Sequence, residues 1–231
     1  MKGALQAAVI CVLGFHASAQ GTFQNLDFEQ AIPVFIAGSE YNDATAASAL
    51  PYWTATIGGV VQSEIPVNLP SAGAPWVSLT APGGTSVGFV PTTPIDGNYS
   101  VLLQGTFATA GISQTGLIPS GTQSLLFESQ IAPVPFGPLN ILIGTQSVPY
   151  VEVGTGPNYI VYGANISAWA GQSEELTFSD PNDSGGWEID DISFSPTAVA
   201  PEPSPLVLTG IGGLLFAIFG CSRFMKAEHS S

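Results

Sequence analysis

Carboxylates are the only side chains that are ionised at neutral pH in the central part of this chain, so chemistry there would rest on them. Between Gln20 and Ala200 the sequence has 15 Asp and Glu residues and no Lys, Arg, His or Cys, which gives a formal charge of −15. A serine or cysteine nucleophile needs an imidazole to accept its proton, and a Schiff base needs a lysine. The composition therefore excludes those enzyme classes.

Catalysis by two carboxylates is the enzymatic route that remains open. A glycoside hydrolase needs a carboxylic acid and a carboxylate at a suitable separation, and Glu64, Glu174–Glu175 or Asp190–Asp191 could supply them. Without neighbouring cations these acids compete for protons, which disfavours the pairing of one acid with one base. We expect a protein that is not an enzyme, with a secreted glycoside hydrolase as an alternative.

The charge and the missing residue types also limit the ligands. A segment at −15 repels nucleic acid and phosphate, which are bound through cationic side chains. Zinc, copper and haem sites rely mainly on His and Cys, so a metal held by carboxylates would be a hard cation such as calcium. The residues of these types lie in the two ends of the chain: Lys2, Cys11, His16, Cys221, Arg223, Lys226 and His229. No disulfide can form within the central segment, so burial and hydrogen bonds must hold it together.

Short strands are the elements that must position these acids. Residues 124–129, 176–179 and 192–195 alternate apolar and polar side chains, which is typical of half-buried strands. Further β-branched or aromatic runs cover 99–103, 139–143, 148–153 and 159–164, and Gly, Pro, Asn and Asp separate the runs. We predict one antiparallel β-sandwich over residues 21–196, resembling a jelly roll, with helix only at the two ends of the chain.

The N-terminus has the three parts of a secretory signal peptide. Lys2 precedes an apolar run over residues 7–15, and Ala17-Ser18-Ala19 offers the small residues of a cleavage site. The spacing predicts a signal peptide over residues 1–19, cleaved after Ala19; the alternative is an N-terminal structural helix.

The C-terminus has the pattern of a membrane anchor. A Pro-rich linker over 197–205 leads into an uncharged apolar run over 206–222, which is just long enough to span a bilayer as a helix. Arg223 and Lys226 follow at once, so the positive-inside rule predicts a cytoplasmic tail over 223–231. The alternative is a buried helix of the domain.

This C-terminal segment resembles the PEP-CTERM sorting signal of exported Gram-negative proteins. The resemblance rests on Pro201, Glu202 and Pro203, then the Gly-rich apolar run, then the basic residues, although the tail lacks a tight arginine cluster. It implies recognition of the Pro-Glu-Pro segment by an exosortase-type sorting enzyme. It also implies export across the inner membrane, with a single membrane pass before transfer to the cell surface or extracellular matrix.

Four short strings in the central segment are similar to landmarks of galactose-binding-like jelly rolls, which include many carbohydrate-binding modules. They are residues 25–29, 51–54, 96–100 and 187–194. The resemblance implies a structural calcium ion between the first and last strands. Its ligands would be Asp27, Glu29 and Asp191, with Asp190 as the alternative to Asp191 because neighbouring residues of a strand point to opposite faces. These acids could instead be solvated or cap turns.

Aromatic rings and carboxylates together would permit sugar binding, because rings stack on the CH face of a sugar while acids and amides accept bonds from its hydroxyls. Tyr41 and Trp76 lie in Pro-, Gly- and Ser-rich stretches and are the candidate ligand-binding residues. The other rings considered are Tyr52, Trp53, Trp169 and Trp187. For every ring the alternative is packing in the core.

Together these features predict an exported, surface-attached or matrix-associated β-sandwich with a structural or adhesive association with exopolysaccharide. The first alternative is a lectin-like carbohydrate-binding module with a defined sugar pocket. The expected partners are the sorting enzyme, extracellular polysaccharide and the membrane at the C-terminal helix, and not nucleic acid.

Overall fold

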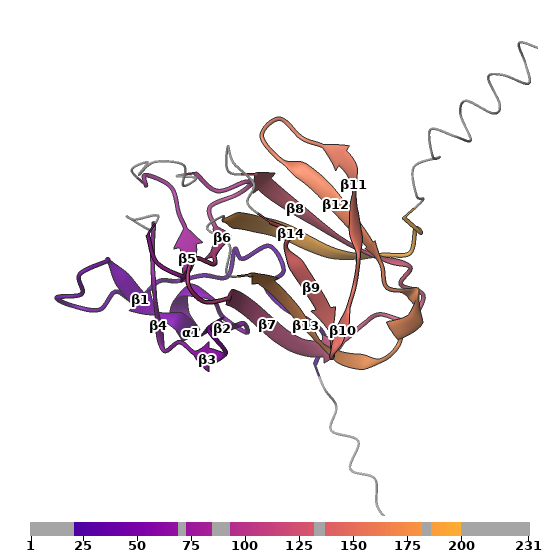
Figure 1. The fold of residues 1–231 in the computed structure, drawn as a ribbon, viewed down its shortest axis with the longest axis horizontal. Coiled ribbons are helices and arrows are strands. Elements are labelled where there is room, and N and C mark those ends of the chain that lie inside the picture. Colours follow the sequence, from indigo (N-terminus) through magenta and orange to yellow (C-terminus); the bar gives the residue numbers. More distant parts are fainter. Residues whose placement is uncertain (1–20, 69–72, 85–92, 132–136, 182–185, 200–231) are drawn as a thin grey trace, which may run out of the picture.

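The computed structural model describes residues 21–68, 73–84, 93–131, 137–181 and 186–199. Within them the chain forms two six-stranded antiparallel sheets, which pack face to face as a sandwich (Figure 1). The predicted all-β sandwich is confirmed. The predicted signal peptide and membrane helix lie outside the described residues, as does the Pro-Glu-Pro segment. In the part of the chain that is described, no helix has the length and apolarity needed to cross a membrane.

The first sheet is built around β7 and β13, which pair along eight residues. Ile112 of β7 and Phe178 of β13 face each other in this register and are both buried. The strand order is β10 (Gln146–Ser147), β9 (Asn140–Ile143), β13 (Ser173–Asp180), β7 (Ala110–Leu117), β2 (Thr54–Ile57) and β3 (Val60–Val61).

The second sheet places the last strand, β14, between β6 and β8. The register of β14 against β8 shifts between Asp190 and Ser193, so a bulge interrupts the ladder there. The strand order is β11 (Tyr150–Thr155), β12 (Ile160–Asn165), β8 (Ser124–Ile131), β14 (Trp187–Ser195), β6 (Ser100–Gln104) and β5 (Trp76–Thr80).

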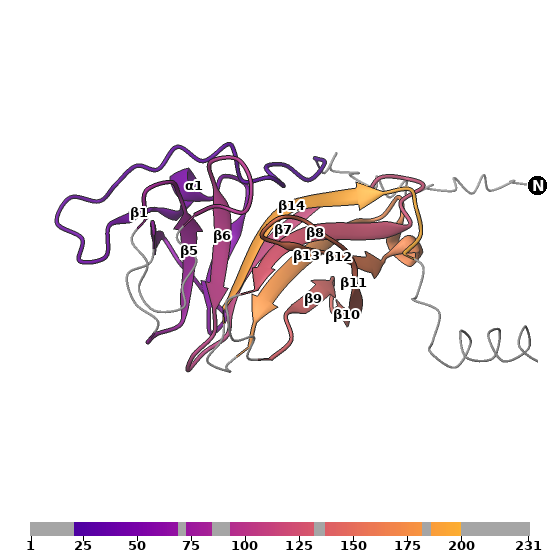
Figure 2. The same cartoon turned by 90° about the horizontal axis from the view of Figure 1, so that it is seen from above.

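A small two-stranded ribbon lies at one end of the sandwich beside β5, as the view from above shows (Figure 2). It pairs β1 (Asp43–Thr45) with β4 (Glu64–Pro66). The four-residue helix α1 (Ala46–Ala49) follows β1, and a 3₁₀ turn covers Ser167–Trp169. These two elements correct the prediction of helix only at the chain ends; both are too short to show helical periodicity in the sequence.

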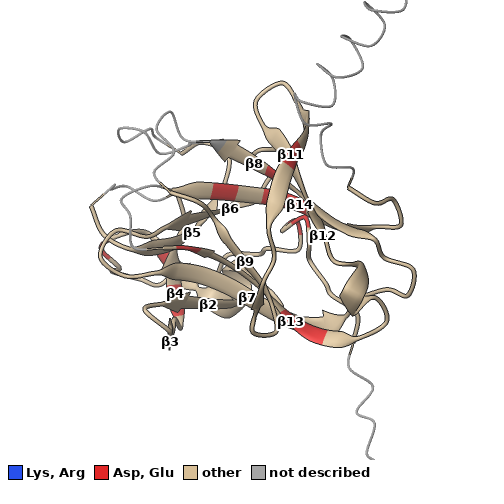
Figure 3. Ribbon diagram, turned by 45° about the vertical axis from the view of Figure 1, so that its right-hand side comes forward, with Lys and Arg blue, Asp and Glu red and all other residues tan. Residues whose placement is uncertain are grey.

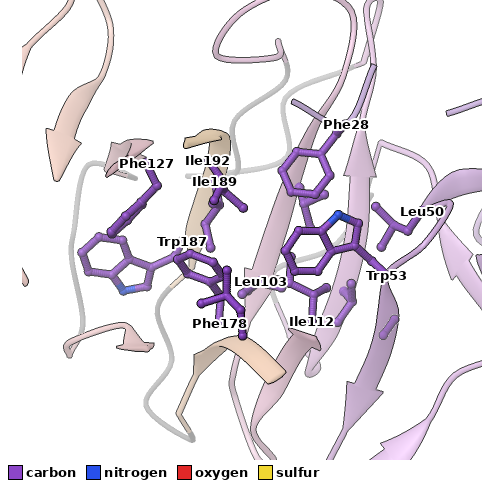
Figure 4. Packing of buried hydrophobic residues seen from close by; sticks show 14 of the residues in the cluster. Phe28, Leu50, Trp53, Leu103, Ile112, Phe127, Phe178, Trp187, Ile189 and Ile192 are labelled. Carbon is purple, nitrogen blue, oxygen red and sulfur yellow. The ribbon is translucent and has the colours of Figure 1, made fainter. Parts of the chain in front are cut away.

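Aromatic side chains fill the space between the sheets (Figure 4). The ring of Phe127 lies 5.3 Å from Phe178 of the opposite sheet and 5.4 Å from Tyr162, measured between centroids. The indole N–H groups of Trp53 and Trp187 donate to the carbonyls of Asn25 and Gly137. Both tryptophans therefore belong to the core, as the packing alternative expected, and Trp169 is half-buried against the same cluster.

Candidate functional site

A cleft of about 440 Å³ lies between the β1–β4 ribbon and the start of β5, and it contains both predicted ligand-binding residues. Tyr41 and Trp76 line it together with apolar side chains such as Ile57 and Ile65. The cleft is polar as well, because Glu40, Asp43, Gln62 and Glu64 also line it.

The two rings meet across this cleft. Tyr41 and Trp76 have their ring centroids 5.3 Å apart, with the ring planes inclined by 57°. Each ring is half-buried, so part of it remains accessible. The indole N–H of Trp76 is buried and has no acceptor among the described residues.

The loop that carries Tyr41 is fixed by its own hydrogen bonds. The amide of Ile36 donates to the carbonyl of Asp43 at 2.8 Å, and the amide of Asp43 donates to the hydroxyl of Ser39 at 2.7 Å. Asn42 has φ +58°, a left-handed conformation that Asn adopts more readily than most residues. Trp76 is held separately, by the pairing of β5 with Gln104 of β6.

The acidic groups of the cleft come from both strands of the ribbon and from the loop. Asp43 lies in β1, half-buried, and Glu64 lies in β4, exposed and in register with Thr45. Glu40 is exposed and adjoins Tyr41. Sequence reasoning missed Glu40, Asp43 and Gln62 as cleft residues. For Glu40 and Asp43, closeness to Tyr41 in the sequence was the available signal, whereas nothing in the sequence indicated Gln62.

A second hollow of about 300 Å³ adjoins the first. It shares Glu40 and Tyr41 with the cleft and is further lined by Asn42, Val67 and Asn68, among others. Asn68 accepts a hydrogen bond from the amide of Ala81 at 2.8 Å, which fixes its side chain. The phenol of Tyr41 thus borders two successive hollows.

The four predicted calcium ligands gather at the bulge of β14. The amide of Ile192 donates to the carbonyl of Leu26, which joins the N-terminal segment to β14. Partial desolvation of its carboxylate raises the pKa of Asp191, and the charges of Asp96, Asp27 and Glu29 raise it further. The alternative position, Asp190, is the buried one, whereas Asp191 is exposed with φ +44°.

The oxygens of these acids are used by the backbone. Glu29 accepts hydrogen bonds from the amides of Asn98 and Tyr99 at 2.6 and 2.8 Å, and Asp190 accepts from the amide of Asp96 at 3.2 Å. Burial opposes the charge on Glu29, but the hydrogen bonds outweigh it and lower its pKa. Among the described residues no group of three or more acids is arranged to hold a metal ion. These hydrogen bonds are of the kind that the turn-capping alternative expects, and the shared calcium ion stays a prediction.

Three further acids that sequence reasoning did not single out lie on three strands: Glu188 on β14, Glu128 on β8 and Asp180 on β13. Glu188 is fully buried; Ser100 donates to its Oε1, and its Oε2 has no hydrogen-bond partner in the described part. Burial raises the pKa of Glu188 to about 7. It also raises the pKa of Glu128 on β8. Asp180, fully buried, accepts a hydrogen bond from the amide of Gly105 at 2.7 Å.

The pKa of Asp190 is raised by burial, like that of Glu188. Burial raises the pKa of Asp190 to about 8, the amides of Asp191 and Asp96 counteract this, and the charges of Asp191 and Glu188 add to it. Because Glu188 and Asp190 are buried, their protonation affects the stability of the fold, and their carboxyl groups are not accessible to a ligand.

The acids that could serve a hydrolase are dispersed. Glu174 and Glu175 lie on β13 of the first sheet, Asp190 and Asp191 lie on β14 of the second sheet, and Glu64 lies in the ribbon. Figure 3 shows the acids distributed over several strands, with no Lys or Arg in the described part of the chain. Of these five, Glu64 alone lines the cleft.

No protein-family model and no curated protein matches the chain. Among solved structures, the carbohydrate-binding module TmCBM61 in complex with β-1,4-galactotriose is 14% identical, with a TM-score of 0.39, and the match covers 76% of this chain and 98% of that chain. The enzymatically active domain of tailspike protein 4 from bacteriophage CBA120 is 17% identical, with a TM-score of 0.35, over 63% of this chain and 19% of that chain. A family 29 carbohydrate-binding module is 15% identical, with a TM-score of 0.33, over 65% of this chain and 99% of that chain. Superpositions this loose say nothing of what the present chain binds.

Proposed function

We propose that this protein is a non-catalytic carbohydrate-binding module whose ligand occupies the Tyr41–Trp76 cleft. The observation that carries the proposal is the pair of half-buried rings, 5.3 Å apart, at the border of a 440 Å³ hollow. The CH faces of a sugar stack on such rings, and its hydroxyls donate to neighbouring carboxylates and amides. The cleft supplies both kinds of group.

A defined cleft favours the lectin-like alternative over general adhesion to matrix. Weak matrix association would need only a polar, acidic surface. Here, loop hydrogen bonds hold Tyr41 and strand pairing holds Trp76, so the two rings are placed before any ligand arrives. Groups held in place beforehand lose less conformational entropy on binding, which supports a specific site.

We further propose that the module is exported and displayed at the cell surface. The support is the sequence: a cleavage site at Ala17 and Ala19, the sorting element Pro201 to Pro203, and the apolar run 206–222 followed by Arg223 and Lys226. The body of the sandwich holds the chain as far as Thr197, whose carbonyl accepts a hydrogen bond from the hydroxyl of Ser124 at 2.7 Å. The sorting element would follow almost directly, so the module would sit close to its anchor.

The direct test is binding of the purified full-length protein to a panel of oligosaccharides by calorimetry. Saturable binding to at least one glycan, without release of reducing ends, supports the proposal. Release of reducing ends would instead assign the glycoside hydrolase alternative.

A further inference from the structure

The aromatic pair in the cleft is surrounded by uncompensated negative charge. Glu40, Asp43 and Glu64 line the same hollow as Tyr41 and Trp76. The described residues contain no Lys, Arg or His, so no cationic side chain within them neutralises these three carboxylates. The segment as a whole has a formal charge of −15, from 15 acidic and no basic residues.

This charge discriminates between classes of glycan. A uronic acid polymer would bring its own carboxylates against Glu40, Asp43 and Glu64, and like charges repel. A neutral sugar would gain stacking and hydroxyl hydrogen bonds but would leave the carboxylates without a counter-charge. A protonated amino group would gain on both counts, because it pairs with a carboxylate and is attracted to the face of an indole or phenol ring.

The two adjoining hollows indicate a ligand longer than one sugar. The cleft of about 440 Å³ and its neighbour of about 300 Å³ share Glu40 and Tyr41. A sugar chain crossing Tyr41 would place successive units in the two hollows, with Glu40 lining both. The site is therefore shaped for an oligosaccharide.

We propose that the cleft selects polysaccharides that carry free amino groups, of the glucosamine-polymer class, over neutral or N-acetylated chains and over uronic acid chains. This inference rests on the carbohydrate-binding function proposed above and adds the chemical class of the ligand.

The test compares four tetrasaccharides that carry positive, negative or no charge. Glucosamine and N-acetylglucosamine tetramers have the same linkage, and N-acetylation replaces the charged amine with a neutral, bulkier amide. The glucose tetramer, which carries neither group, and the galacturonate tetramer are the neutral and acidic probes. Calorimetry with the full-length protein is carried out at mildly acidic pH, at which the amines are protonated. We expect the glucosamine tetramer to bind at least about tenfold more tightly than the other three, which corresponds to about 1.4 kcal/mol.

Matched variants separate the cleft from the overall charge of the protein. Glu40→Gln and Glu64→Gln each remove one exposed carboxylate from the cleft, whereas Glu175→Gln removes one exposed carboxylate from β13 of the first sheet. The two cleft variants should reduce the preference for the glucosamine tetramer several-fold, and Glu175→Gln should leave it unchanged. Thermal melting curves check that all three variants fold.

Three other results would contradict the selectivity or the binding function. Equal affinity for the glucosamine and N-acetylglucosamine tetramers would overturn the selectivity and leave carbohydrate binding standing. An equal loss of preference in Glu175→Gln would assign the preference to the overall charge and also overturn it. Binding to none of the four, nor to the wider glycan panel, would remove the proposed function itself.

Discussion

The ring of Tyr41 lies 5.3 Å from the ring of Trp76, measured between centroids. This contact brings the loop that precedes β1 against the first residue of β5. Neither residue belongs to the central core cluster, in which Trp53 and Trp187 are packed with their indole N–H groups bonded to backbone carbonyls. The indole N–H of Trp76 has no such acceptor in the described part of the chain. Trp53 and Trp187 therefore stabilise the core, whereas Trp76 borders a cleft.

The stability of the protein should fall as the pH rises from about 5 to about 8. The pKa of Glu188 is raised to about 7 and that of Asp190 to about 8, whereas in an unfolded chain both pKa values are about 4. Between these values the folded state holds more protons than the unfolded state, so deprotonation favours unfolding. Thermal melts across this range should show a falling midpoint.

The variant Glu188→Gln should reduce the slope of this dependence without abolishing it, because the amide does not titrate whereas Asp190 still does. Glu152→Gln, an exposed residue of β11, is the control and should keep the wild-type slope. A wild-type midpoint that rises with pH would contradict the buried, protonated state of Glu188.

Phe127→Ala should lower the free energy of unfolding by about 3–5 kcal/mol, because the ring is fully buried and its removal leaves a cavity. Phe107→Ala is the matched control: that ring is 77% exposed, and its loss should change stability by about 0.5 kcal/mol or less. Urea denaturation of the two variants measures the difference. Similar midpoints for both would contradict the placement of Phe127 between the sheets.

Chelation with EDTA should leave the melting temperature unchanged, because the oxygens of Glu29 and Asp190 already accept hydrogen bonds from backbone amides. Glu29→Ala should by contrast destabilise the protein by about 2 kcal/mol, since it removes a charged acceptor from the turn at 96–99. Gly97 in that turn has φ +57°, and a Cβ there would collide with the Glu29 carboxylate. A drop in melting temperature on chelation, reversed by added calcium, would instead establish the calcium site implied by the jelly-roll resemblance.

The surface-exposed form of the protein should begin at Gln20 and end near Pro203, if the two terminal signals are processed as proposed. Intact-mass spectrometry of protein released from the cell surface measures both ends. Recovery of mature protein that still ends at Ser231 would refute removal of the sorting tail.

The strands could be predicted from the sequence because alternation at period two is a local property. The runs at 124–129 and 159–164 lie within or overlap β8 and β12. The choice between Asp190 and Asp191 could not be made, because it depends on the bulge that follows Asp190. The burial of Glu188 was hidden for a similar reason: it depends on neighbouring strands, which bring Ser100 to its carboxylate.

The candidate rings were chosen as residues outside the expected strands, which is correct for Tyr41 but wrong for Trp76, the first residue of β5. The composition of their cleft was not predicted. Asp43 and Glu64 reach the cleft because β1 pairs with β4, and that pairing joins segments whose short lengths give no periodic signal. A cleft formed between a ribbon and a separate sheet is a tertiary property that no local pattern in the sequence encodes.

The most direct test of the account is the affinity of full-length Trp76→Ala for the glycan that the wild-type protein binds, measured by calorimetry. Tyr52→Ala is the control, because that ring is 56% exposed and does not line the cleft. We predict that Trp76→Ala weakens binding at least about tenfold, or about 1.4 kcal/mol, while Tyr52→Ala binds like the wild type. Unchanged affinity in a folded Trp76→Ala variant would contradict the assignment of the cleft as the binding site.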